Sequence, residues 1–360
     1  MLVVDRVALR EDRDAVLLVA RIRASGRDAV ELHIGVPAEH ANALRVSGSP
    51  WLVATLMPAM MSGRTLVVDA PIAPELVGGV ERAQEVMLDW WGPRYRLERV
   101  AVHAPTSSAA GGGQARAAYF SGGIDSYFTV LEHGAGLTHL LYSASVDFQH
   151  DAGRRERALR ANELAAADLG LPLVPVSTNL RGFHDGYAGW VHGYAQALAG
   201  IGHALDGLLG EVRISAAYRA DQGIPWASHP VLAGPVSSAT TTIHHVGSDA
   251  RRIDKVVALA GRDGVVRRLR VCISDDSEGN CGRCEKCLRT AVELAVAGAD
   301  SDGLFEAGLT PGAVAATRMR RTEAIWWHEV LEHPGMARLG PAYRQAIEEA
   351  LMASGQRNRR

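Results

Sequence analysis

The sequence predicts an α/β protein whose core is a parallel β-sheet. From residue 114 onward, short apolar segments alternate with longer helical ones. The turn FSGGIDS, at residues 120–126, connects the first of these apolar segments to a helix. Strands that alternate with helices in this way form parallel sheets with helices on both faces. All four cysteines lie within residues 272–287, which indicates a small metal-binding knuckle on the same domain.

We predict four consecutive parts in this 360-residue chain, a length for which two or three domains are usual. An α+β accessory domain covers residues 1–105, and a linker rich in Ser, Ala and Gly covers 106–113. The nucleotide-binding domain with its knuckle covers residues 114–295. A helical C-terminal extension covers residues 296–360.

The accessory domain has strand and helix signals but no catalytic pattern. Apolar or alternating segments predict three strands, at residues 16–22, 29–34 and 65–68. One helix is expected to begin at Ser49-Pro50, with Ser49 as its N-cap. A second is expected at 74–91, where Gly92-Pro93 would end it. We therefore expect a structural or substrate-docking role for this domain.

The nucleotide-binding domain and the extension carry the remaining predicted elements. Strands are expected at residues 115–120, 140–146, 173–177 and 212–216. Helices are expected at 126–133 and 154–169, and from a cap at Ser248 onward. Past Thr290 the chain is predicted to form helices at 290–297, 321–332 and 341–354, and Trp326 and Trp327 are expected to anchor this last part to the rest of the protein.

The FSGGIDS turn has the composition of a phosphate-binding loop. Gly122 and Gly123 allow the backbone to approach an anion closely. The N–H groups and the dipole at the start of the following helix favour negative charge. Ser121 and Ser126 add hydroxyl donors, and Asp125 is interpreted as a Mg²⁺ ligand or a helix cap.

Other candidate site residues follow later strands. Ligands of such sheets bind at the carboxyl ends of the strands, so we expect the turn, residues 143–149 and residues 177–180 to surround one crevice. Arg219 either reaches a phosphate or substrate carboxylate there or pairs with Asp221. Lys255 or Arg252 either meets the γ-phosphate or pyrophosphate or lies on a solvated helix face. The loop at 225–230, with Trp226 and His229, either covers a planar substrate or is structural.

The four cysteines have the spacing C-x8-C-x2-C-x2-C. They are Cys272, Cys281, Cys284 and Cys287, separated by turns that Gly279 and Gly282 permit. Four thiolates suit tetrahedral Zn²⁺, and we predict a structural zinc site. An iron–sulfur cluster is the alternative. The adjacent histidines His244 and His245 would point to opposite faces of a strand, so we assign them no ligand role.

The pattern SGGxDS resembles the PP-loop of the ATP pyrophosphatases, the adenine nucleotide alpha-hydrolase superfamily. Together with the knuckle, it is most similar to the 7-cyano-7-deazaguanine synthase family. The resemblance spans roughly residues 114–295 and implies a HUP-like α/β fold. It also implies cleavage of ATP between the α and β phosphates, with Mg²⁺, to adenylate a carboxylate or amide before a C–N bond forms. The long segments on either side depart from that family, so the acceptor substrate is not carried over.

The resemblance assigns roles to residues of this sequence. Ser121, Asp125 and Ser126 would be catalytic, and the four cysteines would be the zinc ligands. The phosphate loop would carry over to Ser121, Gly122, Gly123, Asp125 and Ser126. From their positions in the sequence, we add Phe120, Arg219 and Lys255 as candidate ATP-binding residues. The sequence carries no N-terminal cysteine nucleophile of a glutaminase. The nitrogen donor would therefore be ammonia, a partner protein or an amine of the substrate.

Composition and charge narrow the possible functions. The net charge of −2 argues against nucleic acid as a partner. No apolar run approaches the ~20 residues of a membrane span, and the N-terminus does not resemble a signal peptide, so we expect a cytoplasmic protein. Two alternatives stay open. A tRNA-thiolating enzyme predicts a spare cysteine, and a non-catalytic ATP-binding sensor or scaffold predicts binding without turnover.

Overall fold

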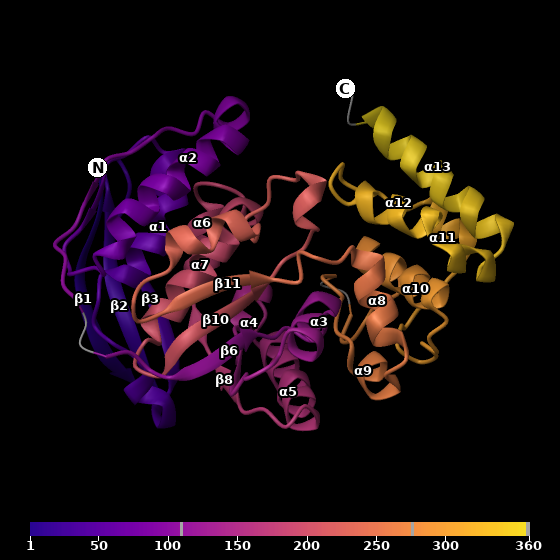
Figure 1. Ribbon diagram of the computed structural model, residues 1–360, viewed down its shortest axis with the longest axis horizontal. Coiled ribbons are helices and arrows are strands. Elements are labelled where there is room, and N and C mark those ends of the chain that lie inside the picture. Colours follow the sequence, from indigo (N-terminus) through magenta and orange to yellow (C-terminus); the bar gives the residue numbers. More distant parts are fainter. Residues whose placement is uncertain (109–110, 275–276, 358–360) are drawn as a thin grey trace. The chain divides into compact units, whose positions relative to one another are not determined.

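The computed structural model describes residues 1–108, 111–274 and 277–357. The chain divides into two compact units, and most of their elements are labelled in Figure 1. The sheet unit comprises Met1–Tyr119 and Gly134–Val246, and the helical unit comprises Phe120–His133 and Gly247–Arg360. These units divide the chain at other positions than the domains expected from the sequence. In particular, the FSGGIDS turn groups with the last third of the chain.

The first sheet of the sheet unit is mixed and six-stranded, in the order β5-β4-β1-β2-β3-β9. The strands β1, β2 and β3 form an antiparallel meander, and β4 and β5 add parallel to β1. Their bounds are Leu2–Asp12 for β1, Ala15–Ala24 for β2, Val30–Pro37 for β3, Leu66–Val68 for β4, Val102–His103 for β5 and Ser177–Thr178 for β9. The three strands expected in this region are confirmed, whereas β1 and β5 were not predicted.

The second sheet is entirely parallel, which confirms the predicted α/β class. Its order is β11-β10-β6-β7-β8. The strands are Ala115–Tyr119 for β6, His139–Tyr142 for β7, Leu173–Pro175 for β8, Leu209–Ser215 for β10 and Thr242–Val246 for β11. Starting from β6, the chain first adds β7 and β8 on one side of this strand and later adds β10 and β11 on its other side. Such a reversal of strand order marks the position where ligands bind in open α/β sheets.

Two expected strands are shorter than predicted. The segment 140–146 leaves the sheet after Tyr142, and Ala144–Asp147 forms the short helix α4. The segment 173–177 ends at Pro175, which has no N–H to donate to a further ladder bond. The next residues form β9, which pairs antiparallel with β3 of the other sheet. Thr178 strengthens this junction, because its Oγ1 donates to the carbonyl oxygen of His33 at 2.7 Å.

Two helices of the sheet unit lie between its two sheets. In Figure 1, α1 (Ser49–Met61) and α7 (Trp190–Ala204) lie between the six-stranded and the parallel sheet. Twelve of the thirteen residues of α1 are buried, since the helix has protein on all sides. The other helices are α2 (Glu75–Tyr95), α5 (Ala152–Asp168) and α6 (Leu180–Asp185). A single hydrophobic core includes residues of both sheets and of α1, α2 and α7.

Two predicted helix ends are wrong. Ser49 is the first residue of α1 rather than its cap, which is Gly48. Its Oγ instead accepts a hydrogen bond from the Ala73 backbone N–H at 2.9 Å. Helix α2 continues through Gly92-Pro93 to Tyr95, where Arg96 adopts the left-handed conformation that ends it. A proline so close to the end of a helix removes only one late hydrogen bond and is tolerated.

A buried histidine compensates for a proline inside α1. Pro58 has no N–H, so the carbonyl oxygen of Ala54, four residues earlier, lacks its normal helical donor. His184 of α6 donates to that oxygen from Nε2 at 2.7 Å. Its Nδ1 is buried without a hydrogen-bond partner among the described residues, and burial lowers the pKa of His184 to about 4. His245 of β11 is similar, with Nδ1 on the carbonyl oxygen of His229 at 2.8 Å and a pKa lowered by burial to about 4.

We expect the sheet unit to lose stability as the pH falls from about 7 toward 4. In that range the unfolded chain protonates these two histidines near the ordinary histidine pKa of 6.5, whereas the folded chain does not until about pH 4. Each depressed pKa therefore costs on the order of 3 kcal/mol by pH 4. Urea unfolding at pH 7.5 and 5.0 measures the loss.

The variant His184→Gln/His245→Asn retains one amide donor at each site and should show a flatter pH profile. His244→Gln, on the exposed face of β11, is the control. A double variant with the same pH slope as this control would contradict the assignment. The structure confirms that the adjacent histidines point to opposite faces, since His244 is exposed and His245 is buried.

The helical unit combines one early helix with the last third of the chain. Its helices are α3 (Ile124–Glu132), α8 (Arg252–Ala260), α9 (Asp263–Arg268), α10 (Glu285–Ala297), α11 (Pro311–Ala315), α12 (Ala324–Glu332) and α13 (Pro341–Arg357). Trp327 is completely buried in a core with Ile253 and Leu288, as its anchoring role predicts. Helix α8 starts at Arg252 and not from Ser248, because the carboxylate of Asp254 accepts from the backbone N–H of Arg251 and fixes the first turn.

The helices of the described part of the chain are too short or too polar for a bilayer. None of them combines the length and the apolar character that crossing a membrane requires.

Candidate functional site

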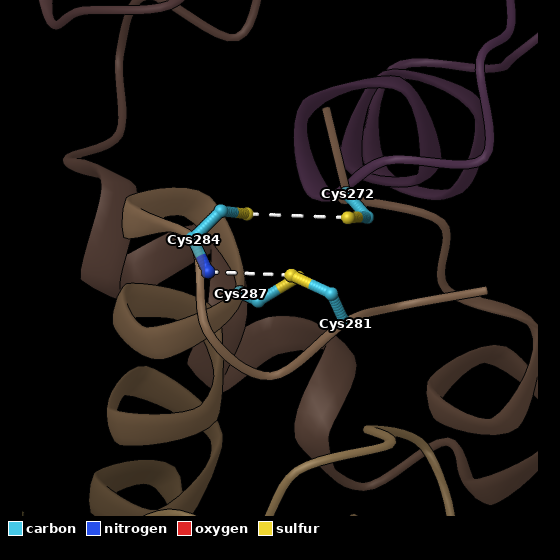
Figure 2. A group of neighbouring side chains, drawn as sticks. All are labelled: Cys272, Cys281, Cys284 and Cys287. Carbon is cyan, nitrogen blue, oxygen red and sulfur yellow. Dashed lines mark hydrogen bonds between the residues drawn. The ribbon is translucent and has the colours of Figure 1, made fainter. Parts of the chain in front are cut away.

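The four cysteines converge on one point in the helical unit (Figure 2). Their sulfur atoms all lie within 4.8 Å of one another. The Sγ atoms of Cys272 and Cys284 are 4.0 Å apart, and those of Cys281 and Cys287 are 3.8 Å apart. Four sulfurs around one ion at a metal–sulfur distance of ~2.3 Å would be roughly 3.8 Å apart. The cluster can therefore hold a metal ion such as zinc.

The local backbone shapes this cluster. The N–H groups of Arg283 and Cys284 donate to the Cys281 sulfur at 3.3 and 3.2 Å. Gly282, directly after Cys281, has φ +70°, and a Cβ at that position would lie 2.2 Å from the carbonyl oxygen of Ala307. Glycine is thus required here by both conformation and space.

Cys284 is also the N-cap of α10, where the helix dipole favours a thiolate. A hydrogen bond from the Cys287 thiol, as the largest cause, lowers the pKa of Cys284 to about 4. The shared proton has the opposite effect on its donor, so the pKa of Cys287 is raised. One thiol of the cluster is therefore already disposed to lose its proton and ligate a metal.

Asn280 is a structural residue of the knuckle that the sequence analysis missed. Its Oδ1 accepts from the backbone N–H groups of Val271 and Cys272, at 2.9 and 3.2 Å. Its Nδ2 donates to the carbonyl oxygen of Leu269 at 2.8 Å. The amide therefore fixes the segment that leads into Cys272. An Asn directly before the second cysteine was the available sequence signal.

The predicted phosphate turn belongs to the same unit. Gly122 has φ +74°, and Gly123 is the N-cap of α3. The carbonyl oxygen of Gly122 accepts from the backbone N–H of Arg270 at 2.8 Å, two residues before the first cysteine. Ser126 donates from Oγ to the carbonyl oxygen of Gly123 at 2.9 Å. The turn and the knuckle are thus connected by a direct backbone hydrogen bond.

The remaining turn residues differ in exposure. Phe120 is buried and packs edge to face on Tyr127, with ring centroids 4.9 Å apart. Ser121 is exposed. Asp125 lies in the first turn of α3, so the interpretation of this residue as the helix cap is wrong.

Asp125 instead pairs with two cations from α8. Its Oδ1 is 3.0 Å from Nζ of Lys255, and its Oδ2 is 2.8 Å from a terminal guanidinium nitrogen of Arg252. Burial raises the pKa of Asp125, but the charges of Lys255 and Arg252 outweigh it and lower the pKa overall. Both cations are buried, with Lys255 only 1% exposed, which excludes the solvated helix face considered for them.

A larger network of charges surrounds this pair. Arg252 also donates from Nε to Glu293 at 3.3 Å, and Arg289 lies 3.4 Å from the same carboxylate. Nε of Arg289 is 2.8 Å from Glu285, which also accepts from the Trp327 indole at 3.0 Å. Burial lowers the pKa of Arg289, but the nearby Glu293 and Glu285 carboxylates raise it overall.

The network balances its charges. Its described members are three cations, Arg252, Lys255 and Arg289, and three carboxylates, Asp125, Glu285 and Glu293. Buried charges are tolerated only when paired in this way. The sequence signal was the spacing of residues 285, 289 and 293, four apart on one helix face, with Arg as the central residue.

Helix α10 connects the cysteine cluster to this network. Its N-cap is Cys284 and its first turn contains Glu285 and Cys287. Arg289 and Glu293 follow on the next two turns. The element that carries two candidate metal ligands therefore also carries the charges that hold Arg252, and through it Asp125.

Other predicted site residues belong to the sheet unit. Arg219 pairs with Asp221, and its Nε is 2.5 Å from the carboxylate. This ion pair was one of the two interactions predicted for Arg219. Trp226 packs on Tyr218 at 5.0 Å and donates to the Tyr194 hydroxyl at 3.1 Å. The expected crevice would combine segments of both units, so it stays a prediction, as does a phosphate contact of Arg219.

Comparison with protein-family models, with curated proteins and with solved structures found no match. The resemblance to the PP-loop superfamily therefore rests on the FSGGIDS turn and the cysteine spacing alone.

Proposed function

We propose that the protein is an ATP-dependent ligase or synthase that adenylates a substrate carboxylate or amide and then forms a C–N bond. One observation carries this proposal. The SGGIDS turn directly follows β6, the strand at which the order of the parallel sheet reverses, and its Asp125 is held by two buried cations. Turns at this point of an α/β sheet bind nucleotides and their phosphates.

The turn supplies the groups that ATP phosphates require. The first turn of α3 presents backbone N–H groups that have no acceptor within the helix. Gly122 and Gly123 would let the phosphates approach these groups, and the exposed Ser121 would add a hydroxyl donor. Phe120 would support the turn from the hydrophobic side, and Ser126 would hold its shape through Gly123.

Lys255 and Arg252 would stabilise the departing pyrophosphate. When ATP binds, its phosphate oxygens would take over these cations from Asp125, which would become free to hold Mg²⁺. The Mg²⁺ would shield the charge of the phosphates. In the absence of nucleotide, Asp125 neutralises the same cations, so the site need not bury unpaired charge in either state.

The reaction begins when an oxygen of the acceptor carboxylate attacks the α-phosphorus of ATP. The bond from that phosphorus to the bridging oxygen breaks, and pyrophosphate leaves with the electron pair. A nitrogen nucleophile then attacks the acyl carbon, and AMP leaves with the former carboxylate oxygen. The nitrogen would come from ammonia, from the substrate itself or from a partner protein.

We propose zinc for the cysteine cluster. Two sulfur pairs are 3.8 and 4.0 Å apart and all four sulfurs lie within 4.8 Å, which suits a single tetrahedral ion. An iron–sulfur cluster instead divides the four thiolates between two or four irons and spreads the sulfurs farther. The sequence has only these four cysteines, so a thiolating enzyme would have no free thiol for sulfur transfer. Elemental analysis of the purified protein should find zinc in a one-to-one ratio, and iron with sulfide would contradict this assignment.

The Asp125→Asn variant tests the proposed activity. The protein is incubated with Mg-ATP, ammonium and a fractionated pool of cellular carboxylates, and the nucleotides are separated by anion exchange. We expect AMP and pyrophosphate from the wild type and a decrease of at least about 100-fold in the variant, because one preorganised charge in such a site contributes roughly 10²–10³ to the rate.

The matched control is Asp263→Asn, an exposed acid in the first turn of α9, which should retain wild-type activity. ATP binding by calorimetry accompanies each assay. A wild-type protein that binds ATP and forms no AMP with any fraction would contradict the ligase and favour an ATP-binding sensor. Equal AMP formation by both variants would exclude Asp125 from the chemistry.

A further inference from the structure

The sheet unit contains a cavity of about 970 Å³ that has no role in the proposed ATP chemistry described above. One wall comes from the β2–β3 hairpin of the N-terminal sheet, including Ile22, Arg27 and Leu32. The facing wall comes from segments that follow β7 and β8 of the parallel sheet, including Gln149 and Arg181. The cavity therefore opens at the carboxyl ends of two parallel strands, where ligands of α/β folds bind. Its size is in the range of small-molecule sites.

Two guanidinium groups are held in place around this cavity. Arg27 stacks over the ring of Tyr187 at 4.2 Å and donates to the carbonyl oxygen of Gly186 at 3.2 Å. Arg181 donates from a terminal nitrogen to the carbonyl oxygen of Val146 at 2.7 Å. Each interaction occupies one of the five guanidinium donors and leaves others for a ligand. A cation that the protein already orients loses less entropy when a ligand binds.

Arg181 also has a donor that the fold leaves unsatisfied. Its Nε is buried and has no hydrogen-bond partner in the described part of the chain. The nearest acidic oxygen, on Asp185, is 3.6 Å away, which is too long for a hydrogen bond. Such a donor is costly unless a ligand or water satisfies it.

The lining favours a singly charged anion with an apolar body. Besides His150, its charged side chains are the two guanidinium groups of Arg27 and Arg181 and the carboxylate of Asp28. Apolar side chains of both walls, such as Leu32 and Phe183, provide surface for a ring. A carboxylate carries one negative charge and accepts two parallel guanidinium hydrogen bonds, whereas a phosphate monoester brings close to two charges.

We propose that this cavity binds an organic carboxylate with a ring-containing apolar body. Because it rests on the proposed ligase function, we infer further that this carboxylate is the acceptor to be adenylated. The N-terminal residues 1–105 would then be a substrate-binding element and not merely a structural one. Arg27 and Arg181 would hold the carboxylate, while the apolar walls would bind the ring.

A charged and an uncharged probe test the proposal without requiring turnover. Naphthoate and its neutral amide, naphthamide, share one ring system and differ in charge. Binding to the full-length protein is measured by calorimetry for the wild type, Arg27→Gln and Arg181→Gln. We expect each variant to bind naphthoate about tenfold or more weakly, as the loss of a charged hydrogen bond implies, with naphthamide binding almost unchanged. Arg157→Gln, on the exposed face of α5 outside the lining, is the control.

Hydrogen exchange checks the location and the folding of the variants. Naphthoate should protect the backbone of residues 26–32 and 179–187 in the wild type. Unliganded variants should exchange like the wild type elsewhere, which would show that they are folded. The proposal is overturned if naphthoate does not bind at millimolar concentration, if naphthamide binds equally well, or if the Arg27 and Arg181 variants match the control.

The outcome is independent of the AMP assay. Charge-dependent naphthoate binding in this cavity, with no AMP formed from any acid, would retain the site and reject the ligase. AMP formation with an unchanged acceptor KM in the Arg27→Gln variant would retain the ligase and reject the site as its acceptor pocket.

Discussion

A chelator that removes the metal ion proposed for the cysteine cluster is expected to unfold the knuckle and to disorder the FSGGIDS turn. Without the ion, four thiol groups remain packed within 4.8 Å of one another, and any thiolates among them repel. In small structural zinc sites the binding free energy is on the order of 10 kcal/mol, and most of it is folding free energy. Because the Arg270 N–H holds Gly122, the loss of the knuckle should reach the turn.

Hydrogen exchange with and without chelator measures this effect segment by segment. We expect faster exchange in α10 and in the first turn of α3, while β1 and β2 of the sheet unit serve as an internal control. The Cys281→Ser variant should behave like the chelated wild type, and added zinc should restore the wild type only. Identical exchange of α10 in both conditions would show that the cluster needs no metal for its structure.

The Glu293→Gln variant is expected to lose about 3–5 kcal/mol of unfolding free energy, the usual cost of removing one partner from a buried ion pair. Glu293 is completely buried and accepts from both Arg252 and Arg289. The neutral amide has nearly the same shape, so packing stays intact while the network retains three cations and two carboxylates. Chemical denaturation at neutral pH measures the difference from the wild type.

Glu348→Gln, an exposed position on α13, is the matched control and should change stability by less than about 0.5 kcal/mol. The companion variant Arg289→Met restores the charge balance when combined with Glu293→Gln. The double variant should therefore cost less than the sum of the two single variants. Strict additivity, or a Glu293→Gln effect as small as the control, would mean that the charges do not act together.

Local patterns predicted the parts of the molecule that depend on nearby residues. The cysteine cluster followed from spacing alone, because two C-x2-C steps can only bring their sulfurs together over a tight turn such as Gly282. Strands such as β2 were found because they contain a continuous apolar run, here residues 15–20. Strand β1 was missed because its second half, from Arg6 to Asp12, is mostly exposed and interrupted by a left-handed residue, Arg6.

Pairings between residues far apart in the chain could not be predicted from local sequence patterns. Nothing near Asp125 indicates that its partners lie 127 and 130 positions later, at Arg252 and Lys255. The spacing of Glu285, Arg289 and Glu293 on α10 does not by itself indicate burial, and only tertiary packing makes these side chains part of a buried network. Similarly, residues 173–177 read as one strand, while Ser177 pairs with the N-terminal sheet. Tertiary packing decides where such a strand ends and which sheet the next residue joins, because packing outweighs local propensity.

The division of the chain has a consequence for the order in which the protein is made. Every strand of both sheets has been synthesised once Val246 has been added, yet the segment from Phe120 to His133 belongs to a unit completed only by later residues. Until Arg252 and Lys255 emerge, Asp125 has no cation from α8 to meet. The nascent chain must therefore leave this turn unassembled between two strands that can already pair. The proposed nucleotide site would be completed last, after the cysteines emerge, so incomplete chains would carry the sheets without the proposed activity.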